Sequence, residues 1–163
     1  MLKVKHIIHN FLGSYTCDSN IIVRNCFLNE RSDIMLIVYY SLTGNVKRFI
    51  QKTKYTNTLT LDQAEGINEP YIIVTGTIGF GEIPDPVRQF LDRHSANLLA
   101  VAASGNRNWG QNYARAGDLI SSTYHVPLLM KFELHGNDND VKEFNIKVEE
   151  ISEYHTRETV QSY

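Results

Sequence analysis

The sequence predicts an α/β three-layer sandwich with one five-stranded parallel sheet of order 2-1-3-4-5, in which one crossover helix is shortened or lost. Short, continuous apolar runs alternate with segments whose apolar residues recur at helical spacing. This alternation is typical of strands that are buried on both faces of a parallel sheet. Between the second and third runs only nine residues, 62–70, are available, whereas a parallel crossover usually needs about a dozen.

Each element follows from a local pattern. The first run, Leu36–Tyr40, is apolar throughout and begins the regular part of the chain. In the second helix, Val87, Phe90 and Leu91 fall on one face and Pro86 suits the first helical position. Polar residues at 137–140 supply capping oxygens for the last helix. We expect strands at residues 36–40, 57–61, 71–75, 98–103 and 128–133, and helices at 46–52, 86–94, 111–123 and 141–153.

The chain of 163 residues suits one domain, which we place at residues 35–154. Residues 1–34 show no convincing helical or strand period, and Met35 stands where such a sheet often begins its chain. We therefore interpret residues 1–34 as an N-terminal extension that is either non-native or loosely packed on the domain. Residues 155–163 are expected to form a polar, frayed tail.

Composition excludes several classes of function. With 16 basic and 18 acidic side chains, the chain has a net charge of -2, so it has no bulk positive field for nucleic acid or anionic lipid. No apolar run approaches the roughly 20 residues that span a bilayer. We expect a cytoplasmic protein that binds neither nucleic acid nor membrane.

The chain also lacks the residues of a thiol or metal centre. Cys17 and Cys26 are its two cysteines, so no thiol is available after Asp33. His94, His125 and His135 are not spaced as metal ligands, and we expect no metal site. Redox chemistry in the main body would therefore need a borrowed cofactor.

The loop after the first strand has the composition of a phosphate site. Ser41, Leu42, Thr43, Gly44 and Asn45 precede Val46, which opens a helix. Unpaired backbone N–H groups at a helix start attract anions, and the side-chain hydroxyl and amide groups can donate to phosphate oxygens. A P-loop lysine and a Gly-x-Gly-x-x-Gly fingerprint are both missing, which argues against magnesium-dependent nucleotide chemistry and against a dinucleotide. The alternative is an ordinary capped helix start.

Two further loops follow the third and fourth strands. In the first of them, three glycines flank Phe80, which gives a flexible backbone against which a flat ring could lie and in which a peptide plane could turn over. The next loop holds Trp109, the one tryptophan, beside amide groups that could read the edge of a heterocycle. A long turn and a packing tryptophan are the alternatives. The two loops are Thr75, Gly76, Thr77, Ile78, Gly79, Phe80 and Gly81, and Ser104, Gly105, Asn106, Arg107, Asn108, Trp109 and Gly110.

The predicted strand order brings the three loops to one edge of the sheet, where ligands bind in open α/β folds. A phosphate cradle, a glycine rim and an aromatic wall together fit a mononucleotide with a large planar head. Flavin mononucleotide (FMN) is the natural candidate, and it would supply the redox chemistry that the missing thiols cannot.

These motifs resemble those of a known family. Ser41–Asn45 resembles the first phosphate loop of flavodoxins, so the sandwich is expected to be flavodoxin-like. Residues 79–91, followed by residues 103–110, resemble the flavodoxin-like stimulatory protein of class Ib ribonucleotide reductase. The resemblance covers about residues 35–153, and the stretch Ser104–Gly110 is its most specific part.

The resemblance implies a bound FMN that an electron donor reduces and that then reacts with oxygen. The oxidant, superoxide in the usual account, would pass to the small subunit of class Ib ribonucleotide reductase and assemble its dimanganese-tyrosyl radical cofactor. The chemistry would occur on the flavin, with no catalytic side chain. Residues 41–46 would hold the phosphate, and Thr75, Gly76, Thr77, Gly79, Phe80, Gly81 and residues 104–110 would flank the isoalloxazine.

A general flavodoxin that shuttles single electrons is the alternative function, with the same fold and cofactor. The charge balance bears on this choice, because residues 35–163 carry 12 basic and 15 acidic side chains. A weakly acidic surface with Arg107 by the ring should repel a doubly reduced, anionic flavin less than a strongly acidic electron carrier would. A receiver-type signalling domain would need clustered acids at the strand ends, where Ser41 and Thr75 stand instead.

Overall fold

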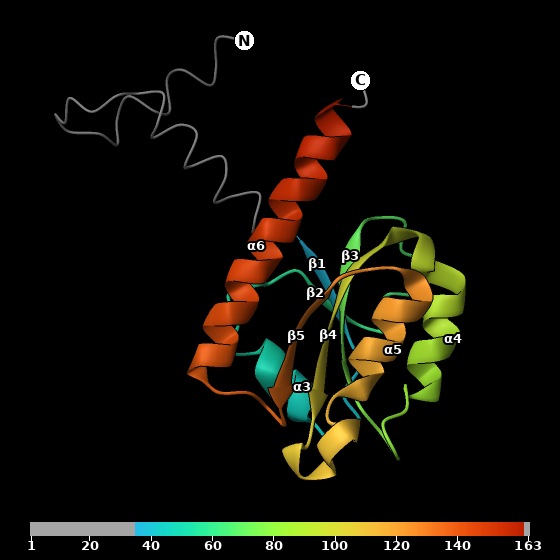
Figure 1. The fold of residues 1–163 in the computed structure, drawn as a ribbon. Helices are drawn as coiled ribbons and strands as arrows, with labels where there is room; N and C mark the ends of the chain where they lie inside the picture. Colours follow the sequence, from blue (N-terminus) through green and yellow to red (C-terminus); the bar gives the residue numbers. More distant parts are fainter. Residues whose placement is uncertain (1–34, 162–163) are drawn as a thin grey trace, which may run out of the picture. The chain divides into compact units, whose positions relative to one another are not determined.

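The computed structural model describes residues 35–161, so the prediction about residues 1–34 lies outside the described residues. Within this range five parallel strands form one sheet in the order β2-β1-β3-β4-β5, as Figure 1 shows. The predicted strand order is therefore confirmed. The strands are β1 (Leu36–Tyr39), β2 (Thr58–Thr60), β3 (Tyr71–Gly76), β4 (Leu98–Gly105) and β5 (Leu128–Glu133).

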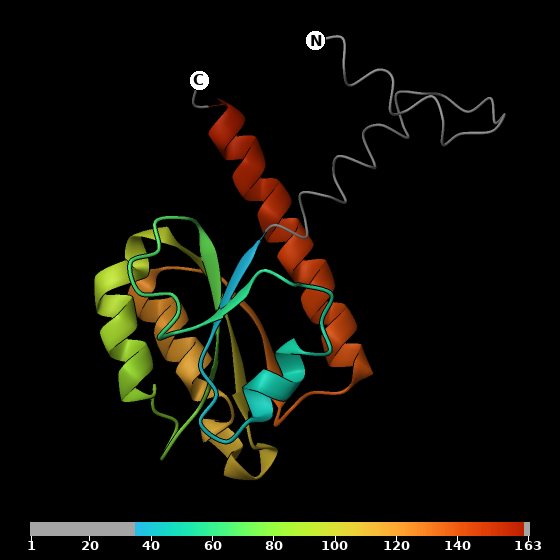
Figure 2. The ribbon, with the colours of Figure 1, turned by 180° about the vertical axis from the view of Figure 1, so that it is seen from behind.

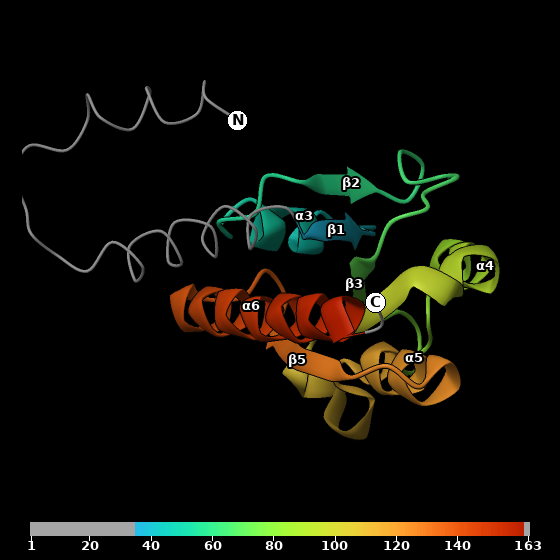
Figure 3. The same cartoon turned by 90° about the horizontal axis from the view of Figure 1, so that it is seen from above.

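Helices cover both faces of this sheet, which gives the three layers. One face packs against α3 and α6, and the other packs against α4 and α5. Figure 3, a view from above, separates α6 from α4 and α5 across the sheet. The helices are α3 (Asn45–Ile50), α4 (Asp85–His94), α5 (Arg115–Tyr124) and α6 (Asp138–Gln161).

Successive residues of the central strands enter opposite layers of the core. Ile37 of β1 packs on the α3 and α6 side, while its neighbours Leu36 and Val38 pack on the α4 and α5 side. All three are at most 1% exposed. This two-sided burial explains the continuous apolar run, because a strand with one solvated face would alternate apolar and polar residues.

Helix α5 begins later than its sequence pattern predicts. Residues 107–112 form short 3-10 turns that are broken by a kink at Gly110, where φ is 52° and ψ is -118°. Ala114 then adopts a left-handed conformation with φ 48°, and regular helix starts at Arg115. The apolar spacing from Gln111 onward was therefore a misleading signal, because the backbone between 110 and 114 is not α-helical.

Helix α6 is longer at both ends than predicted. The Asn137 side chain accepts hydrogen bonds from the backbone N–H groups of Asn139 (2.8 Å) and Asp140 (3.1 Å), which caps the helix start as the polar residues suggested. At the other end the helix continues through the expected polar tail to Gln161. The ion pair between Arg157 and Glu153, at 3.2 Å and one turn apart, supports this extension.

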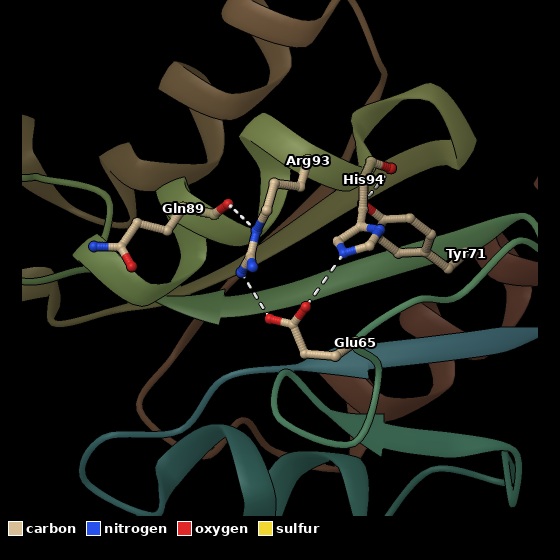
Figure 4. Close-up of polar contacts among 5 residues, drawn as sticks. All are labelled: Glu65, Tyr71, Gln89, Arg93 and His94. Carbon is tan, nitrogen blue, oxygen red and sulfur yellow. Dashed lines mark hydrogen bonds and ion pairs between the residues drawn. The ribbon is translucent and has the colours of Figure 1, made fainter.

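The connection between β2 and β3 contains turns but no helix, as its length predicts, and Figure 2 shows it as an irregular loop. Ala64, which belongs to this connection, is fully buried and joins the core on the α4 and α5 side. Glu65 ties the loop to the end of α4, since its carboxylate accepts a hydrogen bond from Arg93 Nη2 at 2.7 Å. Its second oxygen lies 3.6 Å from His94 Nε2, too far for a hydrogen bond. Figure 4 shows Glu65 facing both side chains.

Two tyrosines that hydrogen-bond to α4, Tyr71 and Tyr124, make the stability of the fold sensitive to high pH. Tyr71 is buried and donates a hydrogen bond to the His94 carbonyl oxygen at 3.1 Å. Tyr124 donates to Asp92 Oδ1 at 3.0 Å. Burial, followed by the neighbouring Asp92, raises the pKa of Tyr124 to about 12, and burial raises the pKa of Tyr71 as well. Because both pKa values are raised by folding, the protonated tyrosines stabilise the folded state relative to the unfolded state.

We expect the free energy of unfolding to fall as pH rises from 10 to about 12, because the unfolded tyrosines ionise near pH 10 while folded Tyr124 resists ionisation up to about pH 12. Below pH 10 the contribution of Tyr124 is fully present. Tyr124→Phe should therefore show a shallower decline than the unmutated chain. Urea unfolding at pH 9, 10 and 11 measures this difference. Parallel declines in the two proteins would refute the assignment to Tyr124.

Candidate functional site

The loops after β1, β3 and β4 meet at the carboxyl edge of the sheet, the lower edge in Figure 1, and enclose a cleft. Its volume is about 190 Å³. The expected site residues in its lining come from all three loops. The lining consists of Tyr40, Ser41, Leu42, Thr43, Asn45, Val46, Gly76, Thr77, Ile78, Pro84, Ser104, Gly105, Asn106, Trp109 and Leu134.

The first loop presents hydroxyl groups at one end of the cleft. Ser41 Oγ accepts a hydrogen bond from the backbone N–H of Lys47 at 3.0 Å, and Thr43 Oγ1 accepts one from Asn45 Nδ2 at 3.2 Å. Both hydroxyl protons remain free to donate, because each oxygen acts as an acceptor in these bonds. Gly44 follows both residues and turns the chain into α3 with φ 79°, a left-handed conformation that suits glycine.

The second loop, Gly79–Gly81, is a tight turn with an exposed aromatic ring at its tip. Ile78 and Glu82 bond to each other through both backbone groups, at 3.1 and 2.8 Å, and thereby close the turn. Gly79 and Gly81 have φ values of 51° and 95°. The Phe80 side chain is 82% exposed, so the turn displays the ring without covering it.

Just before this turn, Thr77 has a hydrogen-bonding atom without a partner among the described residues, and Gly76 borders open space. Thr77 is 9% exposed, and its Oγ1 is buried without a hydrogen-bond partner among the described residues. Such an atom is costly unless something pairs with it. Gly76 has an ordinary φ, and a Cβ added to it would meet nothing within 4 Å. Neither the backbone nor the packing of the protein thus requires glycine there, whereas a ligand that lies close to the backbone would.

The third loop, residues 106–113, places Trp109 at the cleft. Asn106 accepts a hydrogen bond from the backbone N–H of Asn108 at 2.9 Å, which starts the 3-10 turn carrying the tryptophan. Trp109 is 42% exposed and lines the cleft. Arg107 instead lies 3.4 Å from a carboxylate oxygen of Glu133 and stacks 5.4 Å from the Tyr113 ring.

Eight of the expected residues do not line the cleft. Thr75 is fully buried, and its hydroxyl donates to the Gly76 carbonyl oxygen at 3.1 Å. Gly105 does line it, but a Cβ there would lie 2.3 Å from Ala114 N, so packing already explains that glycine. The residues outside the lining are Gly44, Thr75, Gly79, Phe80, Gly81, Arg107, Asn108 and Gly110.

Four lining residues were missed: Tyr40, Ile78, Pro84 and Leu134. Tyr40 directly precedes Ser41 of the first loop, and Ile78 lies within the second loop but was not named among the residues that flank the ring. Leu134 follows β5, a strand end at which no site residue was predicted. Its carbonyl oxygen accepts a hydrogen bond from Ser104 Oγ at 2.6 Å, and its φ of 50° turns the chain toward the cleft.

The cleft edge is rich in exposed apolar side chains. Leu42 is 69% exposed and Leu134 41%, and both stand at the cleft beside Trp109, with Phe80 on the adjoining turn. Within residues 35–157, no three His, Cys, Asp or Glu side chains gather as metal ligands. No helix in the described part of the chain is long and apolar enough to cross a membrane.

Comparison with known proteins gives two results. A family model described as NrdI flavodoxin-like matches residues 37–146. The fold also matches the solved structure of a short-chain flavodoxin associated with a bacterial microcompartment, with a TM-score of 0.57 and 16% sequence identity. That match covers 74% of this chain and 97% of the flavodoxin. At such low identity it shows the fold alone.

The two strand-end glycines should respond oppositely to alanine. Gly76→Ala should change the free energy of unfolding by less than about 0.5 kcal/mol, because the added methyl group enters open space. Gly105→Ala should cost about 1–3 kcal/mol, because its methyl group would overlap the Ala114 backbone. Urea unfolding of the two variants tests the assignment. Equal losses would mean that Gly76 also serves packing.

Proposed function

The chain belongs to the NrdI flavodoxin-like family, and on that premise we propose that it binds FMN in the cleft and supplies superoxide to assemble the dimanganese-tyrosyl radical cofactor in the small subunit of class Ib ribonucleotide reductase. The family comprises the flavoproteins that stimulate this reductase, so a flavin cofactor is implied. The observation that carries the proposal is the cleft, in which hydroxyl donors, open glycine backbone and an aromatic side chain converge from three strand ends.

The first loop is the part suited to phosphate. Ser41 and Thr43 each have a hydroxyl proton to donate, and Gly44 leaves the backbone open, since a Cβ there would meet nothing within 4 Å. Asn45 is already engaged, because its Oδ1 accepts a hydrogen bond from Arg48 Nη2 at 2.7 Å and its Nδ2 bonds to Thr43. We therefore assign hydrogen-bond donation to the phosphate chiefly to the two hydroxyl groups and the backbone N–H groups of this loop.

The other two loops are suited to the isoalloxazine. Gly76 would let a flat ring approach the backbone, the buried Thr77 Oγ1 has no hydrogen-bond partner among the described residues, and Trp109 would lie against the ring. The cleft is smaller than typical ligand pockets of about 300–1,000 Å³, so a ligand as large as FMN would extend out of it. The cleft also contains one phosphate loop, which fits FMN better than a dinucleotide.

When bound, FMN supplies the electron transfer to oxygen that no side chain of this chain can perform. The protein's own groups bind the cofactor, orient it and limit its exposure to water. The projecting edge would lie among the exposed apolar side chains Leu42, Phe80 and Trp109. Such a rim supports the passage of an oxidant to a docked reductase subunit, because a partner can cover it and exclude water.

The phosphate assignment predicts a difference between two ligands. Thr43→Val should weaken FMN binding about tenfold, because a charge-assisted hydrogen bond is lost, and should leave riboflavin binding unchanged. Quenching of Trp109 fluorescence during titration of the protein, freed of flavin, measures both affinities. Ser122→Ala, which removes a hydroxyl on α5 that bonds to the Leu119 carbonyl oxygen, serves as the control. Equal losses for both ligands would contradict the assignment.

The complete function predicts oxygen-dependent activation of the reductase. The reduced protein, mixed with the manganese-loaded small subunit and oxygen, should generate a tyrosyl radical that electron paramagnetic resonance detects. Superoxide dismutase should leave the yield unchanged if the oxidant stays inside the complex. A general flavodoxin would be reduced and reoxidised without forming the radical, so absence of the signal with an FMN-loaded protein would favour the electron-carrier alternative.

A further inference from the structure

Arg115, the first residue of α5, joins the second and third loops of the cleft. We propose that Arg115 is a positioning residue, which holds the Phe80–Gly81 peptide plane and thereby sets the affinity and reduction potential of the flavin in the cleft. The flavin part of this inference rests on the proposed function. No sequence motif marks Arg115, and it lies outside the cleft lining.

The Phe80–Gly81 peptide is held at both of its ends. Arg115 Nη1 donates a hydrogen bond to the Phe80 carbonyl oxygen at 3.5 Å. On the other side of the same peptide plane, the Gly81 N–H donates to the Ile78 carbonyl oxygen at 3.1 Å. A peptide plane that is bonded at both ends cannot turn over without breaking both bonds.

The aliphatic part of Arg115 also packs against this turn. A Cβ on Gly81 would lie 2.8 Å from Arg115 Cδ and 3.0 Å from Arg115 Cβ. Gly81 therefore has two reasons to be glycine, its φ of 95° and this close approach. The aliphatic part of Arg115 thus packs against Gly81, and its guanidinium donates a hydrogen bond to the Phe80 carbonyl oxygen.

The preceding peptide of the turn is free by comparison. Within residues 35–161, neither the Gly79 carbonyl oxygen nor the Phe80 N–H forms a hydrogen bond with the protein. Rotation of the turn is therefore confined to the Gly79–Phe80 peptide, whose N–H and C=O remain available to a ligand. By fixing the next peptide, Arg115 determines which backbone group the turn beside the cleft presents.

Arg115 also brings a positive charge to this turn, and it forms no ion pair in the described part of the chain. In the described part of the chain it lies within 4 Å of no acidic side chain, whereas Arg107 faces Glu133. A cation at the turn lowers the cost of negative charge on a reduced flavin, and salt screens this effect because the side chain is exposed. Arg115 rather than Arg107 is therefore the arginine expected to influence the reduced state.

The test compares Arg115→Met, Arg115→Lys and the control Arg88→Met, which removes one exposed positive charge from the neighbouring helix α4. In protein without flavin, amide hydrogen exchange at Gly81 should rise about tenfold in Arg115→Met and stay unchanged in the control. The dissociation constant for FMN should rise about three- to tenfold in the same variant. At low salt, the potential of the second reduction step should fall in Arg115→Met, and Arg115→Lys should restore it.

Unchanged Gly81 exchange and FMN affinity in both Arg115 variants would overturn the inference while leaving the proposed function intact. A fall in potential that Arg88→Met matches would assign the effect to general charge and would also overturn it. If the unmutated protein bound no FMN, the proposed function would fail, yet amide exchange would still decide whether Arg115 holds the peptide. The exposed position of Arg115 favours folding of both variants, and urea unfolding checks it.

Discussion

The close contact between Gly105 and Ala114 is the constraint on which the arrangement of the cleft depends. Gly105 ends β4, and no side chain fits there because the Ala114 backbone N would lie 2.3 Å from its Cβ. The third loop therefore begins and ends at nearly the same point, and the eight residues between must project outward. The Leu134 N–H donates to the Gly105 carbonyl oxygen at 3.0 Å, so the chain after β5 is bound to the same place.

The contact also links the loops to one another. Ala114 has a left-handed φ of 48°, and this turn directs the next residue, Arg115, back toward the glycine turn after β3. The loops that follow β3, β4 and β5 are consequently braced through one short stretch of backbone. The loop after β1 has its own hydrogen bonds, from Lys47 N–H to Ser41 and from Asn45 to Thr43, and so is held independently of the other loops.

Sequence patterns were sufficient for the fold and for the loops, but not for the partners of individual side chains. Continuous apolar runs identify strands such as β5, because burial on both faces leaves no other pattern. The interleaved glycines likewise identify the turns. Arg107, however, pairs with Glu133, which is 26 positions away at the end of β5, and no local pattern reveals such a contact. The left-handed conformations of Ala114 and Leu134 were equally hidden, because neither residue type favours them.

The turn that replaces a crossover helix between β2 and β3 has a consequence for how the chain assembles. The central strands β1 and β3 are adjacent in the sheet, yet all of α3 and β2 lies between them in the chain. Omitting about a dozen residues from that excursion lowers the entropic cost of bringing the two strands together, but only by about 0.3 kcal/mol, since closure entropy grows with the logarithm of length. The short connection hence reduces the length of the chain while changing the entropic cost of pairing β1 with β3 very little.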